Sequence, residues 1–172
     1  MAKYFNISGE LTQELLAPGD GTKVSKISLT NTQKVAKCKV DLYIEKINIG
    51  KFYLIKQVEL PIGATLIYND IRFSNYDQDF GLYIKLTDGD SFTLSGTIDV
   101  TGTNVNVPGD SNTLFLSELS VGDEVVVSGE TRTIATITAN NAATVTAAFG
   151  SDLASDASPD CNPTALVDVI IN

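Results

Sequence analysis

Apolar and polar residues alternate along residues 38–68. The apolar positions form three runs of period two, with polar side chains between them: Cys38, Val40, Leu42 and Ile44, then Phe52, Leu54, Val58 and Leu60, then Ala64, Leu66 and Tyr68. This period is typical of half-buried strands. Turn sequences at residues 48–51 and 61–63 separate the runs. The pattern predicts a three-stranded meander with one apolar face, which a second sheet must cover.

The flanking segments continue this pattern. Residues 24–30 and 81–86 alternate in the same way and predict two further strands. Residues 12–17 precede a Pro-Gly turn, so we expect a hairpin with Leu11 and Leu15 pointing inward. The final run, residues 166–171, is too apolar for a free tail, and we expect it to return to the first sheet as a closing strand.

Charge and aromatic content change abruptly near residue 90. Residues 1–90 hold eleven basic residues, eleven acidic residues and ten aromatics, whereas residues 91–161 hold one basic residue, nine acidic residues and three aromatics. A composition break of this kind indicates a domain boundary. We therefore predict a discontinuous β-sandwich docking domain of residues 1–90 plus 162–172, interrupted by an inserted acidic β module of residues 91–161.

The inserted segment has a strand pattern of its own. It predicts short strands at residues 96–100, 105–107, 124–127, 131–138 and 143–149, a helical turn at 114–119, and a linker at 151–163. About seventy residues is near the lower limit for independent folding. The predicted fold is thus all-β: an antiparallel, jelly-roll-like sandwich with an inserted small β-barrel or sandwich module.

The composition supports the all-β fold class and limits the kinds of partner that the chain can bind. The 172 residues include no Trp and no His, and the net charge is −9. No apolar run approaches the ~20 residues that span a bilayer, and the first residues do not resemble a signal peptide. We therefore expect no membrane partner and no secretory route of that kind. We also expect no nucleic-acid partner, because phosphate contacts need clustered Lys and Arg.

The two cysteines, Cys38 and Cys161, favour free thiols over a disulfide. Cys38 occupies an apolar position of a predicted strand, and Cys161 lies at a predicted junction. Two cysteines without histidine make a zinc site improbable. A bridge between them stays open as the alternative.

No residue pattern indicates catalysis. Histidine, the commonest general base, is absent, and the sequence has neither a G-x-S-x-G elbow nor a phosphate-binding glycine loop. The pairs Asp77 and Asp79, and Asp88 and Asp90, have the residue types of catalytic carboxylates or calcium ligands, but they lack a full calcium-loop pattern and flank turns, where Asp is common for local hydrogen bonding. We expect no enzyme activity, no cofactor and no metal.

Two stretches carry a resemblance. From Lys23, "KVSKISLTNTQKVAKCKVDLYIE", then "KFYLIKQVELPIGATLIYND" and "GLYIKL" are similar to small β-sandwich structural proteins of tailed bacteriophages. The shared features are a TN-type turn, a V-D-L-Y-I strand and a Y-x-L-x-x-V-x-L-P-x-G-x-x-L hairpin. "LFLSELSVGDEVVVSGETRTIATITANNAATVTAAF" looks like a β module of phage tail and fibre proteins. The resemblance implies a virion structural protein assembled in the host cytoplasm, and it carries no catalytic motif.

Three functions from different classes follow. The first is capsid decoration, or another surface-accessory role, through the sandwich domain. The second is a tail, neck or fibre component that mediates host attachment or carbohydrate binding. The third, a glycosidase or depolymerase, has the least support because no catalytic pattern is present.

The predicted partners are other virion proteins, either the major capsid protein or neck and tail components, together with further copies of this chain. Basic and aromatic residues of the sandwich are the candidate assembly contacts: Lys34, Lys37, Lys39, Tyr43, Tyr53 and Tyr83. The alternative interpretation is a sugar-stacking face formed by Tyr43, Tyr53, Tyr68, Tyr76 and Tyr83.

Overall fold

The structure is a computed structural model, and it describes residues 1–46, 48–74, 80–102, 104, 106–156 and 159–172. Contacts divide the chain into two compact units. Unit 1 is Met1–Asp88 with Ala165–Asn172, and unit 2 is Gly89–Thr164. Tyr76, Asp77 and Asp79 lie outside the described residues, as does the first residue of the strand predicted at 105–107.

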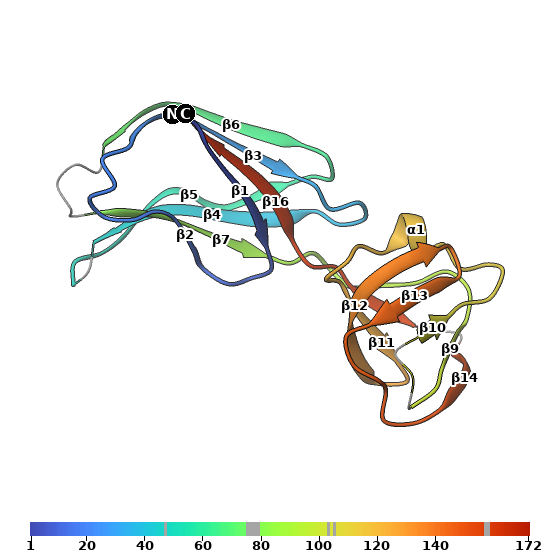
Figure 1. The fold of residues 1–172 in the computed structure, drawn as a ribbon. Coiled ribbons are helices and arrows are strands. Elements are labelled where there is room, and N and C mark those ends of the chain that lie inside the picture. Colours follow the sequence, from blue (N-terminus) through green and yellow to red (C-terminus); the bar gives the residue numbers. More distant parts are fainter. Residues whose placement is uncertain (47, 75–79, 103, 105, 157–158) are drawn as a thin grey trace. The chain divides into compact units, whose positions relative to one another are not determined.

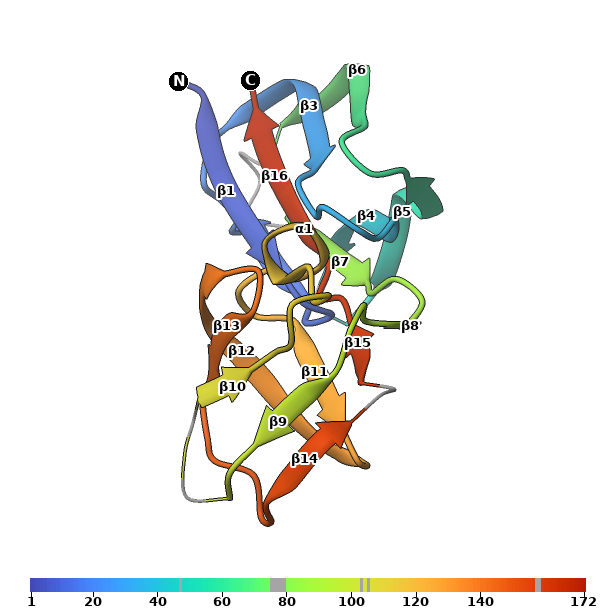
Figure 2. The same cartoon turned by 90° about the vertical axis from the view of Figure 1, so that its right-hand side faces the viewer.

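The described residues of unit 1 form eight strands in two antiparallel sheets (Figure 1). One sheet, here called sheet A, has the order β1-β16-β3-β6, and the other, sheet B, has the order β2-β7-β4-β5. The strand bounds are β1 (Lys3–Ser8), β2 (Gln13–Leu16), β3 (Lys23–Asn31), β4 (Cys38–Lys46), β5 (Gly50–Leu60), β6 (Thr65–Ser74), β7 (Gly81–Thr87) and β16 (Leu166–Ile171). Figure 2 shows the strands of sheet A side by side.

The strand order is that of a jelly roll. In chain order, sheet A takes the first, eighth, third and sixth strands of unit 1, and sheet B takes the second, seventh, fourth and fifth. Two four-stranded sheets filled in this alternating way make a double-sheet jelly roll. The all-β sandwich predicted from the sequence is therefore confirmed.

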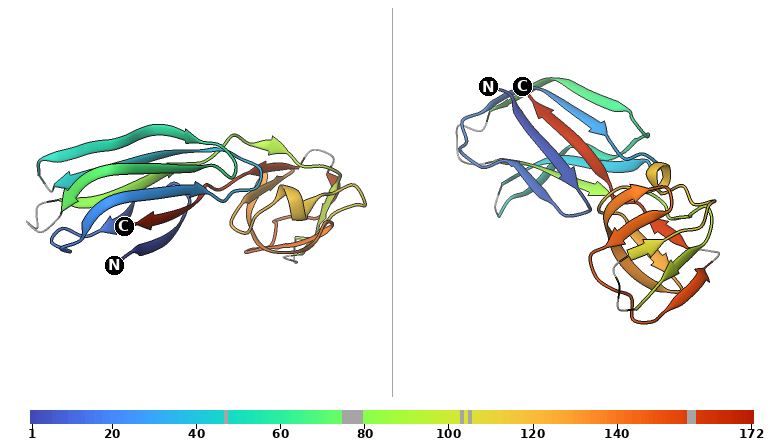
Figure 3. Two further views of the ribbon diagram at one scale, coloured as in Figure 1. Left: turned by 90° about the horizontal axis from the view of Figure 1, so that it is seen from above. Right: turned by 45° about the vertical axis from the view of Figure 1, so that its right-hand side comes forward.

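The alternating positions fill the space between the two sheets, whose layers are visible in Figure 3. In β16, Val167, Val169 and Ile171 are each 1% exposed, and Ile27 and Leu29 of β3 lie beside them in register. Residues of sheet B complete the same core, among them Val40, Leu42, Ile84 and Leu86. Successive side chains of a strand point to opposite faces, so every second side chain lies in the core.

The predicted meander is wrong in its third strand. β4 and β5 pair as the hairpin that the sequence predicts, but β6 pairs with β3 in sheet A. The other edge of β4 is taken by β7. The Pro61-Ile62-Gly63 turn therefore carries the chain from one sheet to the other, and periodicity could not distinguish this crossing from a hairpin.

The predicted N-terminal hairpin is also wrong. β2 pairs with β7 and not with β3. Leu15 points inward as predicted, at 4% exposure, whereas Leu11 is 78% exposed. Leu11 precedes the strand, so the alternation of β2 does not extend to it.

Unit 2 contains a six-stranded sheet, β10-β13-β12-β11-β15-β8, and the pair β14-β9. The bounds are β8 (Phe92–Thr93), β9 (Ile98–Val100), β10 (Asn106–Pro108), α1 (Phe115–Glu118), β11 (Glu124–Val127), β12 (Glu130–Ala139), β13 (Ala142–Val145), β14 (Leu153–Asp156) and β15 (Asp160–Asn162). The helical turn expected at 114–119 is confirmed by α1. A separate core lies around Phe115, Leu119 and Phe149.

The linker predicted at residues 151–163 is wrong, because β14 and β15 lie within it. β15 pairs with both β11 and β8, which places Cys161 in the core of unit 2 at 0% exposure. Short strands rich in Asp, Ser and Ala carry too little apolar alternation to be recognised. Whether unit 2 folds independently of unit 1 stays a prediction.

Both cysteines are free and buried, one in each core. Burial raises the pKa of the Cys38 thiol to about 11, with a smaller contribution from Asp88. Burial also raises the pKa of Cys161, and the Asp123 carboxylate adds to this effect. The free thiols agree with the sequence prediction, but Cys161 is a core residue and not a junction residue.

Cys38→Ser and Cys161→Ser should each lower the free energy of unfolding by roughly 1–2 kcal/mol, because each places a poorly paired hydroxyl in a core. The acceptor of the Cys161 thiol, Asp123 Oδ2, lies 4.0 Å from the sulfur, which is too far for a hydroxyl hydrogen bond. Urea unfolding of the full chain measures both losses. Adding reductant to the wild type should leave its melting temperature unchanged. A loss confined to Cys38→Ser would contradict the burial of Cys161.

Candidate contact surfaces

A row of tyrosines crosses the outer face of sheet B. Glu14 of β2 lies opposite Tyr83 of β7, Tyr83 lies opposite Tyr43 of β4, and Tyr43 lies opposite Tyr53 of β5. We call these four residues the tyrosine row. Residues directly opposite on one face of a sheet are close enough for their side chains to touch. The register therefore brings together three of the six candidate contact residues.

The rings of the row pack on one another. The Tyr43 and Tyr83 rings are stacked with centroids 5.7 Å apart, and the Tyr53 ring is tilted against Tyr43 at 5.4 Å. Lys51 Nζ lies 4.5 Å from the centroid of the Tyr43 ring and donates a hydrogen bond to its hydroxyl at 3.1 Å. As a result Tyr43 is only 1% exposed, although it lies on the outer face.

Two charged groups contact the row, Glu14 at its β2 end and Lys51 at Tyr43. The Tyr83 hydroxyl donates to Glu14 Oε2 at 3.1 Å. Desolvation, and then this hydrogen bond to a carboxylate, raise the pKa of Tyr83. The hydrogen bond to Tyr43 raises the pKa of Lys51. Both groups thus keep their protons at neutral pH, and each donates a hydrogen bond within the row.

This packing argues against a sugar-stacking face. A sugar needs an open ring face, but the rings of Tyr43 and Tyr83 face each other, and Lys56 Nζ lies 4.8 Å from the centroid of Tyr53. Tyr43 is also too buried for the role of assembly contact predicted for it, which is therefore wrong for this residue. Tyr53, at 42% exposure, remains accessible to a protein partner.

Gly81 makes room for the row. A Cβ atom at this position would lie 2.7 Å from Cε2 and from the hydroxyl of Tyr83. We expect Gly81→Ala to displace the Tyr83 ring and to destabilise unit 1 by roughly 1–3 kcal/mol, the usual range for overpacking. Urea unfolding measures the loss, and near-ultraviolet circular dichroism reports the ring displacement directly.

Tyr83→Ala supplies the control for Gly81→Ala. If the clash is with the Tyr83 ring, then Gly81→Ala should cost much less in the Tyr83→Ala background than in the wild type. If Gly81→Ala lowers the free energy of unfolding equally in both backgrounds, the loss does not come from a clash with the Tyr83 ring.

The basic candidates lie next to the same sheet. Lys34 and Lys37 are in the connection between β3 and β4, Lys39 is in β4, and all three are exposed. Lys37 Nζ lies 2.9 Å from Glu59 Oε2, and Lys39 is opposite Glu59 in the register of β4 and β5. Glu59 thus offsets part of the positive charge that the sequence suggested.

Asn31 shapes the connection that carries these lysines, and the sequence analysis did not single it out. It is 0% exposed, and its Nδ2 donates to the carbonyl oxygens of Ala36 and Leu60, both at 3.0 Å. Its Oδ1 accepts from the backbone N–H of Gln33 at 2.9 Å. The signal for this role is a lone Asn at an inward position of an alternating strand, where an apolar residue is expected.

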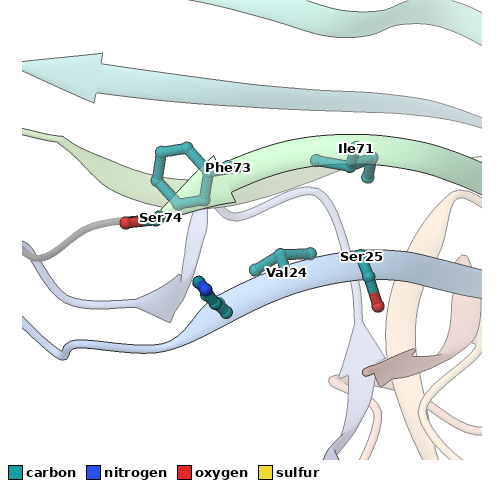
Figure 4. Close-up of a pocket in the computed structure, with 6 residues that line it drawn as sticks. Val24, Ser25, Ile71, Phe73 and Ser74 are labelled. Atoms are coloured by element: carbon teal, nitrogen blue, oxygen red, sulfur yellow. The ribbon is translucent and has the colours of Figure 1, made fainter.

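A pocket of about 400 Å³ opens between β3 and β6 (Figure 4). Lys23, Val24, Ser25, Ile71, Phe73 and Ser74 line it. It forms where the register of the two strands shifts between Val24 and Lys26. The described residues that line it include no carboxylate and no thiol.

Unit 2 contains a buried carboxylate that the sequence analysis treated only as part of a turn. Asp123 is 0% exposed, and its two oxygens accept from the backbone N–H groups of Ser120, at 2.7 Å, and Thr164, at 2.9 Å. Asp123 thereby fixes the turn before β11 to the segment after β15. The role is structural, because both oxygens are used within the fold.

The described residues form no metal centre. No group of three or more His, Cys, Asp or Glu among them could hold a metal ion. Asp88 is engaged within unit 1: its N–H donates to Glu10 Oε1 at 3.1 Å, and its Oδ1 accepts from the N–H of Ala165 at 2.7 Å. Within the described part of the chain, no helix has the length and apolar character to span a membrane.

Comparisons with protein-family models, with curated protein sequences and with solved structures found no match to this chain.

Proposed function

We propose that this chain is a structural protein of a bacteriophage virion, most simply a capsid decoration or surface-accessory protein. Unit 1 docks on the particle, and unit 2 faces solvent. Two kinds of observation support the proposal. The sequence resembles phage β-sandwich structural proteins, and unit 1 has the strand order of a jelly roll, an architecture that viral capsid domains and lectins use.

We assign different roles to the two units because their net charges differ. Unit 1 contains eleven Lys and Arg against eleven Asp and Glu, whereas unit 2 contains one against ten, so unit 2 accounts for the whole net charge of −9. A neutral surface with exposed aromatics suits a protein interface. An acidic surface suits solvent, and its self-repulsion keeps neighbouring copies and particles apart.

The docking surface that we assign comprises Lys34, Lys39 and Tyr53. All three are exposed, and they lie on sheet B or on the connection leading into it. An exposed aromatic beside cations fits an acidic neighbour, where the aromatic supplies buried area and the cations supply steering. Lys37 contributes less, because Glu59 is its ion-pair partner.

Copy number in purified particles tests the function. Quantitative mass spectrometry of virions produced by the phage that encodes this chain gives its ratio to the major capsid protein. Hundreds of copies are expected for capsid decoration. A few to a few dozen copies would instead support a tail, neck or fibre component, for which glycan-array binding is the next measurement. Absence from the particle would overturn the proposal.

Charge reversal tests the docking surface. Lys34→Glu with Lys39→Glu should weaken incorporation into particles, and the loss should be larger at low salt, because exposed charges are screened within about 10 Å at 0.1 M salt. Lys23→Glu, at an exposed position at the start of β3, is the matched control. Equal incorporation of both variants at every salt concentration would show that this surface does not contribute to docking.

A further inference from the structure

The outer face of sheet A carries a row of exposed apolar side chains. Tyr4 of β1 lies opposite Ile170 of β16, Ile170 lies opposite Ser28 of β3, and Ser28 lies opposite Ile67 of β6. Tyr4 is 72% exposed, Ile67 51% and Ile170 37%. We call these three apolar residues, together with the half-buried Ser28 between Ile170 and Ile67, the apolar row. It crosses all four strands of the sheet, whose arrangement Figure 2 shows.

Polar residues border the apolar row on the side toward the end of β3. Asn6, Asp168, Thr30 and Thr65 face one another in register. Asn6 Nδ2 donates to Asp168 Oδ1 at 2.6 Å, and the Thr30 and Thr65 hydroxyls are 2.9 Å apart. An apolar strip with a polar border is the composition of an interface core and its rim.

We propose that this face binds a second copy of the chain across a two-fold axis that runs along the apolar row. Such an axis places the same four residues of both copies against each other, as an isologous interface requires. Two sheets packed face to face lie about 10 Å apart, so the side chains of both rows fill the space between them. The inference concerns the face alone and does not depend on the phage assignment.

The positions of Lys26 and Asp168 beside the apolar row favour a second copy of the chain as the partner that binds this face. Lys26 lies two residues before Ser28 on β3, and Asp168 lies opposite Thr30, on the other side of the row. The two-fold axis reverses the strand direction, so Lys26 of each copy comes to lie over Thr30 and beside Asp168 of the other copy. One face therefore supplies both partners of two symmetric ion pairs.

These two charges do not pair within one copy. Four register positions separate them, which is about 13 Å along the strands. Among the described residues, no ion pair involves Lys26. Within the part of the chain that the structure describes, these two charges can therefore meet only between copies.

The size of the face sets the expected affinity. Four strands about 4.8 Å apart and about six residues long cover roughly 400 Å² in projection, or about 800 Å² over both copies, which is below the roughly 1,000 Å² that a stable interface buries and fits only a weak, transient one. We therefore expect a reversible dimer with a Kd on the order of tens of micromolar. Sedimentation velocity of the full chain over a concentration series measures it.

Matched isoleucine variants locate the interface. Ile67 and Ile62 are 51% and 52% exposed, but Ile62 lies in the turn between β5 and β6 and not on this face. Ile67→Ser should weaken the dimer by about tenfold or more, whereas Ile62→Ser should leave its Kd unchanged. Both positions are exposed, so thermal melting should show folded protein in each case.

A charge swap tests the axis. Lys26→Glu and Asp168→Lys should each weaken the dimer, and the double variant should recover most of the loss, because the swapped charges meet again only across the axis. A wild type that stays monomeric at every concentration would overturn the proposal. So would a dimer that Ile67→Ser does not weaken, or single losses that the double variant fails to recover.

Discussion

Removal of Ala165–Asn172 should abolish the cooperative unfolding of unit 1. These residues contain β16, which is an inner strand of sheet A and pairs with β1 on one side and β3 on the other. Val167, Val169 and Ile171 are each 1% exposed, and burying such a side chain contributes about 1.5–3 kcal/mol. Their combined loss approaches the 5–15 kcal/mol that stabilises a typical domain.

The opposite result is expected when Gly89–Thr164 is replaced by a short Gly-Ser linker. The two points where the chain leaves and re-enters unit 1 are adjacent, since Asp88 Oδ1 accepts from the N–H of Ala165 at 2.7 Å. The cores of the two units share no buried residue. A short linker can therefore close the gap, and loop-closure entropy changes by only about 0.6 kcal/mol per doubling of length.

Circular dichroism melting of both truncated proteins distinguishes the outcomes. We expect a cooperative transition for the linker variant and none from unit 1 after the tail is removed. If the linker variant is unfolded while the tail deletion melts cooperatively, then unit 1 is not the discontinuous domain proposed from the sequence. Two cooperative proteins would show that β16 is dispensable.

Asp123→Ala should destabilise unit 2 by roughly 2–5 kcal/mol. The substitution leaves the N–H groups of Ser120 and Thr164 without their acceptor, and each unsatisfied buried donor costs about 1–3 kcal/mol. Asp123→Asn should cost less, because its single carbonyl oxygen still accepts one of the two hydrogen bonds. Urea unfolding gives the losses, and hydrogen exchange at the two amides locates them.

Glu124→Ala is the matched control for Asp123. Glu124 is the next residue along the chain and is exposed, so its removal should change the free energy of unfolding by less than about 0.5 kcal/mol. An Asp123→Ala variant as stable as Glu124→Ala would contradict the anchoring role. Faster exchange confined to residues far from the turn would also contradict it.

Some errors of the sequence analysis have a common physical cause. Alternation reports that one side of a strand is buried, but not which sheet the strand joins. β6 was therefore recognised as a strand and assigned to the wrong sheet. Tyr43 was assigned to an exposed face for a similar reason: it does point outward, and only its register with Tyr53 and Tyr83 covers it.

For the candidate contact residues, exposure could be predicted from the sequence, but the residues that they pair with could not. That Lys34, Lys37 and Lys39 are exposed could be predicted, since polar residues in a connection or between inward positions face water. The ion pair of Lys37 with Glu59 could not, because the two residues meet only through the register of β4 and β5. The apolar row was missed because its residues come from four strands that are distant in sequence.

The sequence by itself determined the class of fold, most of the longer strands and the uneven distribution of charge. These properties depend on local periodicity and on composition, which neighbouring residues specify. Only the tertiary structure decided which strands join which sheet of the jelly-roll-like sandwich, the tyrosine row, the apolar row and the burial of Cys161. Each of these depends on the register between strands far apart in the chain, and register is set by the collective packing of a core that no single segment encodes.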